Sequence, residues 1–186
     1  MKYYRWLRLK WLQFCRKYIF KEVAENRYKK LHRILSLEAE WNLNFIALTV
    51  SACLIATFGL ISNSTAVIIG AMIIAPLMLP IRALAFGALE GDVILFRKAL
   101  SSIIGATIIA LWLSWFTGTV IRIPEFGSEV LGRTQPNLVD LGIALTAGTI
   151  SGFAKVRQGI SDALAGTAIA VALMPPLCVV GLSLSQ

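Results

Sequence analysis

The chain has 186 residues, of which 57% are hydrophobic and only 15% are charged, and its mean hydropathy is +0.73. Soluble domains carry roughly 25% charged residues, so this composition excludes a soluble enzyme, a disordered tail and a disulfide-stapled secreted module. Residues 1–43 hold 15 of the 28 formal charges, 11 Lys or Arg and 4 Glu, which predicts a short basic segment ahead of a membrane domain.

Residues 1–43 are the first predicted element, a basic amphipathic helical segment in the cytoplasm or at the membrane interface. Leu7, Trp11, Phe14 and Tyr18 recur at three- and four-residue spacing, with Lys and Arg among the positions between them. A basic helix with aromatic anchors lies at the interface and attracts anionic lipid headgroups. We therefore expect a lipid anchor, joined to the first span through residues 26–36. A nucleic-acid or partner-docking surface is the alternative, because basic charge alone is unspecific.

Five apolar stretches follow and make up a transmembrane domain, residues 44–186. They run about 44–62, 64–81, 99–121, 138–154 and 163–185. At 1.5 Å per residue, the shortest is roughly 26 Å long and the longest roughly 34 Å, against about 30 Å for the hydrocarbon core of a bilayer. Their backbones must be helical where they face lipid, because no water pairs with free amides there. The sequence predicts an all-α integral membrane protein with about five transmembrane helices.

The distribution of positive charge orients these spans. Residues 82–98 hold three Lys or Arg and residues 155–161 hold two, whereas the connection 61–65 has none. Because cytoplasmic loops carry an excess of Lys and Arg, the N-terminus and the connections 82–98 and 155–161 are expected in the cytoplasm. We expect a multi-pass protein of a prokaryotic-type cell membrane, and five spans leave its C-terminus outside.

Two parts of the chain resemble each other. Residues 73–78 (IIAPLM) match residues 173–178 (LMPPLC), and residues 47–49 and 144–146 are both ALT. The matched spans run in opposite directions under this topology. The two units would therefore be inverted repeats, with the third span between them.

Both units contain proline within an apolar span. Pro76, Pro80, Pro175 and Pro176 should kink or break their helices, because proline lacks the amide donor and collides with the carbonyl four residues earlier. Many transporters build a midplane site from paired, interrupted helices in inverted repeats. Prolines that only shape helix packing are the alternative.

Polar residues at the start of the second span complete the candidate pathway. Asn63, Ser64 and Thr65 could face a solute, while a helix N-cap at Ser64 or Asn63 is the alternative. Arg82 could pair with an anion, or extend its charged end to the headgroups. The full set of candidate pathway or helix-break residues is Asn63, Ser64, Thr65, Gly70, Pro76, Pro80, Arg82, Gly166, Pro175 and Pro176.

Small residues recur at four-residue spacing in the last two spans, as at Ala144, Gly148 and Gly152. Such ridges let helices approach closely. Packing within one subunit and assembly of several subunits use the same ridges, so the pattern does not separate them. We expect a homo-oligomer.

Cysteine and histidine usage argues against a metal or cofactor site. Cys15, Cys53 and Cys178 show no CxxC spacing, and the single histidine, His32, lies in the basic segment. A zinc site needs several converging ligands, and the membrane part cannot supply them. The spans also lack paired carboxylates and a glycine-rich phosphate loop, so we expect no enzyme, no cofactor and no metal.

Two motifs resemble a known membrane family. The stretch 63–81, NSTAVIIGAMIIAPLMLPI, and the later stretch 164–177, LAGTAIAVALMPPL, are similar to the two signatures of the bacterial and archaeal family called domain of unknown function 389. The resemblance covers about residues 44–186. The family carries no established activity, so the resemblance implies a membrane class. Many relatives carry a soluble domain beside the membrane region, where this chain has a basic segment.

The favoured function is a channel or transporter for a small solute or ion. All acidic residues after residue 43 fall in loops or at span ends, which argues against a proton-coupled carrier with a buried acidic relay; they are Glu90, Asp92, Glu125, Glu129, Asp140 and Asp162. The alternative is a structural or assembly subunit without a transport pathway. We expect lipid, and no nucleic acid, as the partner.

Overall fold

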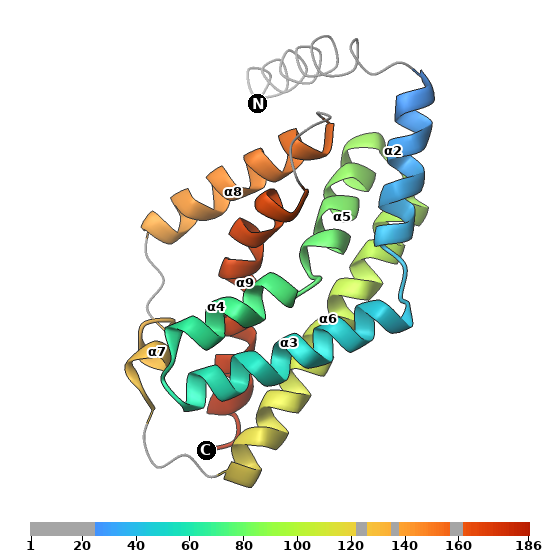
Figure 1. Cartoon of the computed structure of the whole chain (residues 1–186). Coiled ribbons are helices and arrows are strands. Elements are labelled where there is room, and N and C mark those ends of the chain that lie inside the picture. The colour runs from blue at the N-terminus through green and yellow to red at the C-terminus, as the bar shows by residue number, and fades with distance from the viewer. Residues whose placement is uncertain (1–24, 122–125, 135–137, 157–161) are drawn as a thin grey trace, which may run out of the picture.

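The computed structural model describes residues 25–121, 126–134, 138–156 and 162–186, with the side chains of residues 25–27, 155–156 and 162–172 left undescribed. Every regular element in these ranges is an α-helix, labelled α2 to α9 in Figure 1. The expected all-helical class is confirmed for the described chain. Of the predicted basic segment, residues 1–43, the part at residues 1–24 lies outside the described residues.

Two helices are long and apolar enough to cross a membrane, α3 (Leu43–Ile61) and α6 (Val93–Ile121). α4 (Thr65–Ile74) and α5 (Met78–Glu90) meet the same criterion together, as a pair bent by 51°. The described chain thus holds two candidate spans, or three if the bent pair is one span.

The last two long helices contribute shorter apolar stretches. α8 (Leu138–Val156) contains the apolar stretch Leu138–Ala154. α9 (Asp162–Ser183) contains the apolar stretch Leu173–Ser183 in the part whose side chains are described. These helices begin and end within two residues of the expected fourth and fifth spans. Apolar helices of this kind are compatible with a membrane location, and the count of five spans stays a prediction.

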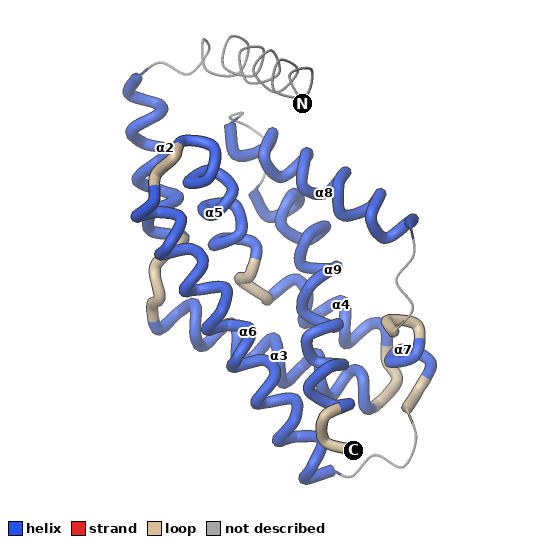
Figure 2. Tube along the Cα trace, turned by 180° about the vertical axis from the view of Figure 1, so that it is seen from behind, coloured by secondary structure: helices blue, strands red, loops and turns tan. Residues whose placement is uncertain are grey.

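α6 runs the length of the molecule, and the other long helices pack around it. α3 and α4 form a hairpin that lies against α6 and α9, and α8 lies against α9 (Figures 1 and 2). The main core is a cluster of buried residues from α3, α4, α6 and α9, including Ala52, Leu60, Ile68, Ala106 and Met174. The outer face of α6 is apolar and exposed, as at Ile108, Trp112 and Val120.

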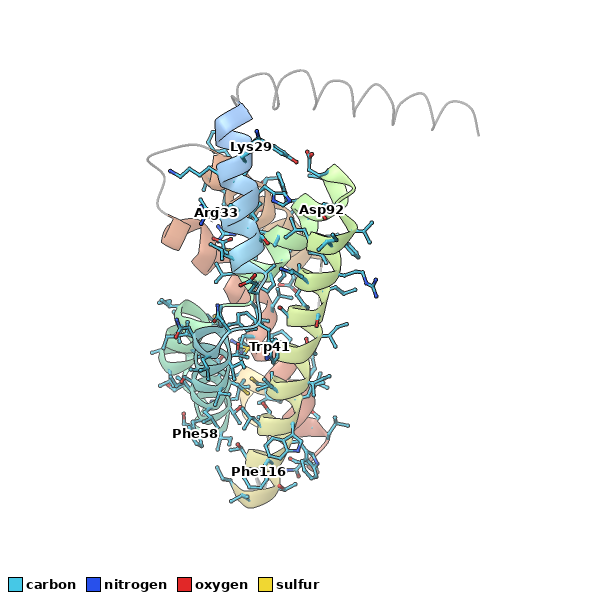
Figure 3. The ribbon with its side chains drawn as sticks, turned by 90° about the vertical axis from the view of Figure 1, so that its right-hand side faces the viewer. Lys29, Arg33, Trp41, Phe58, Asp92 and Phe116 are labelled. Carbon is cyan, nitrogen blue, oxygen red and sulfur yellow. The ribbon has the colours of Figure 1, made fainter. Side chains whose placement is uncertain are left out.

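α2 (Glu25–Glu38) covers the whole stretch 26–36 that was expected to be a join, so this stretch is a helix. Leu35, together with Ala39 just after the helix, buries its side chain against Ala83 of α5 and against Leu95 and Ala99 of α6. The apolar side of α2 is therefore paired with the membrane helices rather than left as a linker (Figure 3).

The expectation of a loop at residues 82–98 is wrong. α5 continues to Glu90 and α6 already begins at Val93, so only two residues separate the helices. Gly91 ends α5 in the left-handed region at φ 74°, where glycine has no steric penalty. The Asp92 carboxylate accepts hydrogen bonds from the amides of Ile94 (2.9 Å) and Leu95 (3.0 Å), which caps the start of α6. Charge counting predicted a loop, whereas good helix formers and these two caps produce a tight turn.

Candidate functional site

The predicted polar residues at 63–65 form the turn between α3 and α4. Asn63 has a φ of 51°, in the left-handed region that asparagine tolerates. Its Oδ1 accepts a hydrogen bond from the amide of Glu129 at 2.9 Å, and Thr65 Oγ1 donates to Glu129 Oε1 at 2.5 Å. Ser64 is the N-cap of α4 through its backbone, with no side-chain capping bond. The turn is therefore clamped onto the short helix α7 (Ser128–Leu131).

The carboxylate in this clamp is held in its ionised form. The hydrogen bond from Thr65, and next the Arg133 guanidinium at 2.6 Å, lower the pKa of Glu129 below its ordinary value. The clamp closes the α3–α4 hairpin at one end of the molecule. Its hydroxyl and amide groups are used in holding the hairpin, rather than directed at the break between α4 and α5.

The break between α4 and α5 is the most unusual backbone feature of the described chain. Ala75, the residue before Pro76, is extended (φ −60°, ψ 121°), as expected before a proline. Pro76 has no N–H, so the carbonyl of Met72 loses its helical partner. Leu77 begins α5 without a side-chain capping bond. Ala75, Pro76 and Leu77 are all buried, so these backbone polar groups lie in the interior.

The other three prolines of the candidate set lie within helices. Pro80 lies in the first turn of α5, where its missing amide would have no intrahelical partner in any case. α9 is helical through Pro175 and Pro176, so these prolines do not break it, and the expected kink stays a prediction. Neighbouring helices hold α9 in place, since Met174 and Cys178 on either side of the two prolines belong to the main core. The similar motifs at 73–78 and 173–178 thus adopt different backbones.

The two glycines of the predicted set have different places. Gly70 lies on α4, and a Cβ there would meet nothing within 4 Å. Gly166 lies within α9, in the part whose side chains are not described. Gly70 therefore faces open space rather than the core.

Arg82 is buried, and its charged end does not extend to a surface. Its side chain is 8% exposed, and Nη2 lies 3.8 Å from Oε2 of Glu38, whose side chain is 16% exposed. The ion pair joins α5 to α2. The arginine that could have held an anion already has a carboxylate of the same chain beside it.

Further polar contacts hold α2 against the turn between α5 and α6. Tyr28 donates to Glu90 Oε2 at 2.9 Å, and His32 Nε2 lies 2.7 Å from Asp92 Oδ2. The Leu95 amide first, and then His32, lower the pKa of Asp92. Burial and the Glu90 carboxylate raise the pKa of Tyr28. Figure 3 shows Asp92 beside α2 at this end of the molecule.

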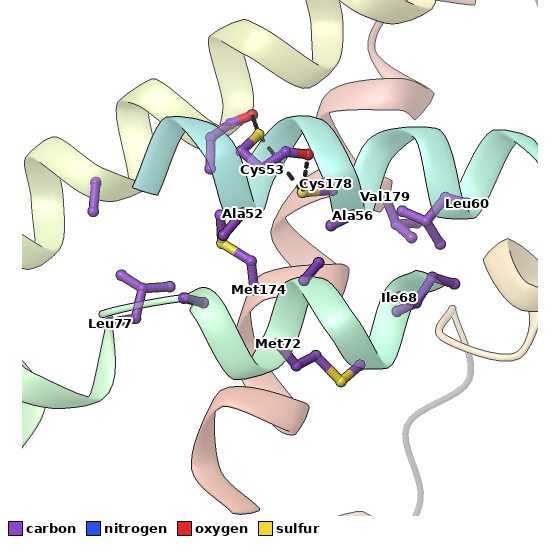
Figure 4. Packing of buried hydrophobic residues seen from close by; sticks show 14 of the residues in the cluster. Ala52, Cys53, Ala56, Leu60, Ile68, Met72, Leu77, Met174, Cys178 and Val179 are labelled. Carbon is purple, nitrogen blue, oxygen red and sulfur yellow. Dashed lines mark hydrogen bonds between the residues drawn. The ribbon is translucent and has the colours of Figure 1, made fainter. Parts of the chain in front are cut away.

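A polar cluster in the core was not predicted. Cys53 Sγ of α3 lies 3.8 Å from Cys178 Sγ of α9 (Figure 4). Cys53 Sγ also lies 3.4 Å from Ser114 Oγ of α6, and Ser114 Oγ lies 3.0 Å from Thr57 Oγ1. Thr49 and Thr57 each donate to the carbonyl four residues earlier, at 2.7 Å. The four-residue spacing of Thr49, Cys53 and Thr57 was the available signal, because it places all three on one face of a helix.

The structure brings together only some of the predicted residues. Ala75 and Leu77, which flank Pro76, share the main core with Met174 and Cys178, close to Pro175 and Pro176. The turn at 63–65 contacts α7 and Arg82 contacts α2, at different places in the molecule (Figure 1). Among the described residues, no three His, Cys, Asp or Glu side chains converge where a metal ion could sit. The polar groups of the core cluster around Cys53 are backbone carbonyls, hydroxyls and thiols.

Comparison with known proteins finds relatives that have no assigned activity. The family model described as domain of unknown function (DUF389) matches residues 72–186. An uncharacterized protein of Methanocaldococcus jannaschii, MJ0678, is 30% identical over 154 residues, which cover 83% of this chain and 48% of that protein. The chain thus spans about half the length of the curated relative. No solved structure gives a significant match.

Proposed function

The chain belongs to the family described as domain of unknown function (DUF389), and we propose that it works in the cell membrane as a channel or transporter for a small solute or ion. In this proposal the N-terminal segment lies in the cytoplasm. No residue is assigned a catalytic role and no cofactor is needed. The protein is a homo-oligomer in this proposal, which a mass measurement in detergent tests.

The observation that carries the proposal is the buried break between α4 and α5. A 51° bend in an apolar helix pair leaves backbone polar groups without helical partners. In a bilayer such groups are tolerated only where they are buried in protein or line a water-filled cavity. Transporters use broken helices of this kind to coordinate ions and polar groups of substrates.

The polar groups of the core and of the break suggest which species could pass. The core cluster around Cys53, Thr57 and Ser114 offers hydroxyl and thiol dipoles, and the carbonyl of Met72 adds a backbone acceptor. None of these groups carries a formal charge in its ordinary state, so they suit a neutral solute or a weakly hydrated ion. A carrier that moves protons through a chain of carboxylates does not fit them.

Purified protein in planar bilayers and in liposomes tests the proposal. We expect conductance in KCl, or osmotic swelling in urea or glycerol, above that of protein-free membranes. Pro76→Ala should straighten the break and lower the flux by about ten-fold, equal to ~1.4 kcal/mol on the barrier. Pro80→Ala is the matched control, because Pro80 lies in a first helical turn. Circular dichroism checks that both variants fold.

A structural subunit without a pathway is the second candidate. The close contact of α9 with α6 favours it, since a Cβ at Gly181 would lie 2.6 Å from Ser114 Cβ and leave no room between the helices. A folded wild-type protein with no flux for any of the three probes would support this second function and overturn the transport proposal.

A further inference from the structure

A cavity of about 460 Å³ opens between the chain that follows α2 and the first turns of α6, and we propose that it binds the headgroup of an anionic phospholipid. Arg97 and Lys98 hold the phosphate, and the acyl chains follow the apolar face of α6. The two basic residues of the site, Arg97 and Lys98, lie outside the segment 1–43, for which the sequence predicts lipid contact. It does not depend on whether a solute crosses the protein.

One wall of the cavity is fixed by specific contacts. Ser102 donates a hydrogen bond to the carbonyl of Ala39 at 2.7 Å, which holds the segment after α2 against α6. The Trp41 ring lies against Gly105, where a Cβ would overlap it, and its centroid is 5.8 Å from that of Phe45. Figure 3 shows Trp41 beside α6, where the chain passes from α2 to α3. The indole is therefore held in place before any ligand arrives.

The charged end of the cavity favours an anion. Arg97 is exposed and makes no ion pair within the described residues. Lys98 Nζ lies 3.4 Å from Glu40 Oε1, with both side chains about half exposed. Two cations and one carboxylate leave a net positive charge at the opening. The guanidinium fork and the lysine ammonium are the groups that proteins use for phosphate oxygens.

The cavity carries charged side chains, and the exposed face of α6 that continues beyond it is apolar. Arg97 stands eight residues before Gly105, about 12 Å along α6. Tryptophan favours the boundary between headgroups and hydrocarbon. Exposed Leu100, Ile104 and Ile108 continue along α6 beyond the charged end. A phospholipid has this order of chemistry, an anionic head followed by apolar chains, whereas inorganic phosphate would use the two cations alone.

Charge also argues against the chain's own N-terminal segment as the occupant. Residues 1–24 contain seven Lys or Arg and one Glu, so Arg97 and Lys98 would repel them. An anionic lipid instead gains two favourable charge contacts.

Fluorescence of Trp41 tests the site directly. In a variant with Trp6, Trp11, Trp112 and Trp115 replaced by Phe, Trp41 is the only tryptophan. The variant is reconstituted in vesicles of phosphatidylcholine and phosphatidylglycerol, in which one or the other lipid carries brominated chains that quench nearby indoles. We expect brominated phosphatidylglycerol to quench Trp41 more strongly than the same fraction of brominated phosphatidylcholine.

Charge variants show whether the cavity causes this preference. Arg97→Gln with Lys98→Gln should lower the preference by about five-fold or more, the effect of one basic side chain near an anionic surface. Glu40→Gln should raise it, and Arg97→Lys should retain most of it. Lys30→Gln with Arg33→Gln removes the same charge from exposed positions of α2 and is the matched control.

Several outcomes would overturn the proposal. These are equal quenching by the two lipids, a preference that survives the loss of Arg97 and Lys98, and an equal loss in the control. Absence of quenching by either lipid would show that protein, such as a second copy of the chain, covers the cavity. Displacement of the brominated lipid by millimolar inorganic phosphate would show a site for free anions instead.

Discussion

At the scale of single residues, Arg82 and Glu38 join α5 to α2 through an ion pair that is largely shielded from solvent. Taking two charges out of water is costly, and their mutual attraction offsets this cost only when both are present. The loss of one partner leaves the other charge in a poorly solvated place. Variants of this ion pair therefore measure how strongly the contact between α2 and α5 stabilises the protein.

Replacing one partner alone should lower the free energy of unfolding by more than the ion pair itself contributes. We expect Arg82→Gln to lower the free energy of unfolding by about 3 kcal/mol, because Glu38 would keep its charge without the guanidinium beside it. Glu38→Gln with Arg82→Gln should cost less than the sum of the single changes, with a coupling of about 1–3 kcal/mol. Denaturant titration in detergent, followed by circular dichroism, measures these values.

Arg33→Gln provides the control for this cycle, because Arg33 is exposed on α2. Its effect should stay within about 0.5 kcal/mol. Strictly additive costs of the Glu38 and Arg82 variants would contradict an interacting pair.

At the scale of helices, the surroundings of two glycines distinguish a tightly packed helix face from an open one. Gly181 of α9 faces α6, and a Cβ there would lie 2.8 Å from the carbonyl oxygen of Leu111. Gly148 of α8 has nothing within 4 Å of the same position. The crossing of α6 and α9 therefore depends on the absence of a side chain, while the glycine face of α8 lies open.

The same substitution at these two glycines should have opposite effects on stability. Gly181→Ala should lower the free energy of unfolding by about 1–3 kcal/mol, because the added methyl group meets backbone that cannot move away easily. Gly148→Ala should be neutral, or stabilising by up to about 1 kcal/mol, since alanine is the better helix former. Thermal unfolding of the detergent-solubilised protein compares the two variants, and equal destabilisation would contradict the packing described.

At the scale of the whole molecule, the charge of the N-terminal segment predicts the direction in which the chain crosses the membrane. Eleven Lys or Arg precede residue 44, and such an excess favours the cytoplasmic side. Cys15 lies in this segment, while Cys53 and Cys178 are fully buried in the core. Cys15 is therefore the thiol to use as a marker of orientation.

We expect a membrane-impermeant maleimide to label Cys15 in inside-out vesicles and not in intact cells. Cys15→Ser should remove the labelling of inside-out vesicles, because the two remaining thiols are buried among helices. Unfolding in detergent should make all three thiols of the wild-type protein reactive, which controls for reagent quality. Labelling of Cys15 in intact cells would reverse the expected topology.

Sequence reasoning was most accurate where the signal was local. The bounds of α3, expected at 44–62 and observed at Leu43–Ile61, follow from one uninterrupted apolar run with turn residues on either side. Pro76 marks the break between α4 and α5, because the lost amide acts on the same helix. The prolines of α9 did not end that helix, because residues of α3 and α6 pack against it, and no local pattern reports their presence.

The sequence by itself determined the helical class, the apolar character of the helices and the family, because composition and hydrophobic run length need no knowledge of distant contacts. Only the tertiary structure decided that residues 82–90 continue a helix, that Arg82 has Glu38 beside it, and that Cys53 meets Cys178. Each of these depends on two segments far apart in the chain, whose contact free energy outweighs local preference. The pattern of charge and hydropathy along the chain carries no information about contacts between distant segments.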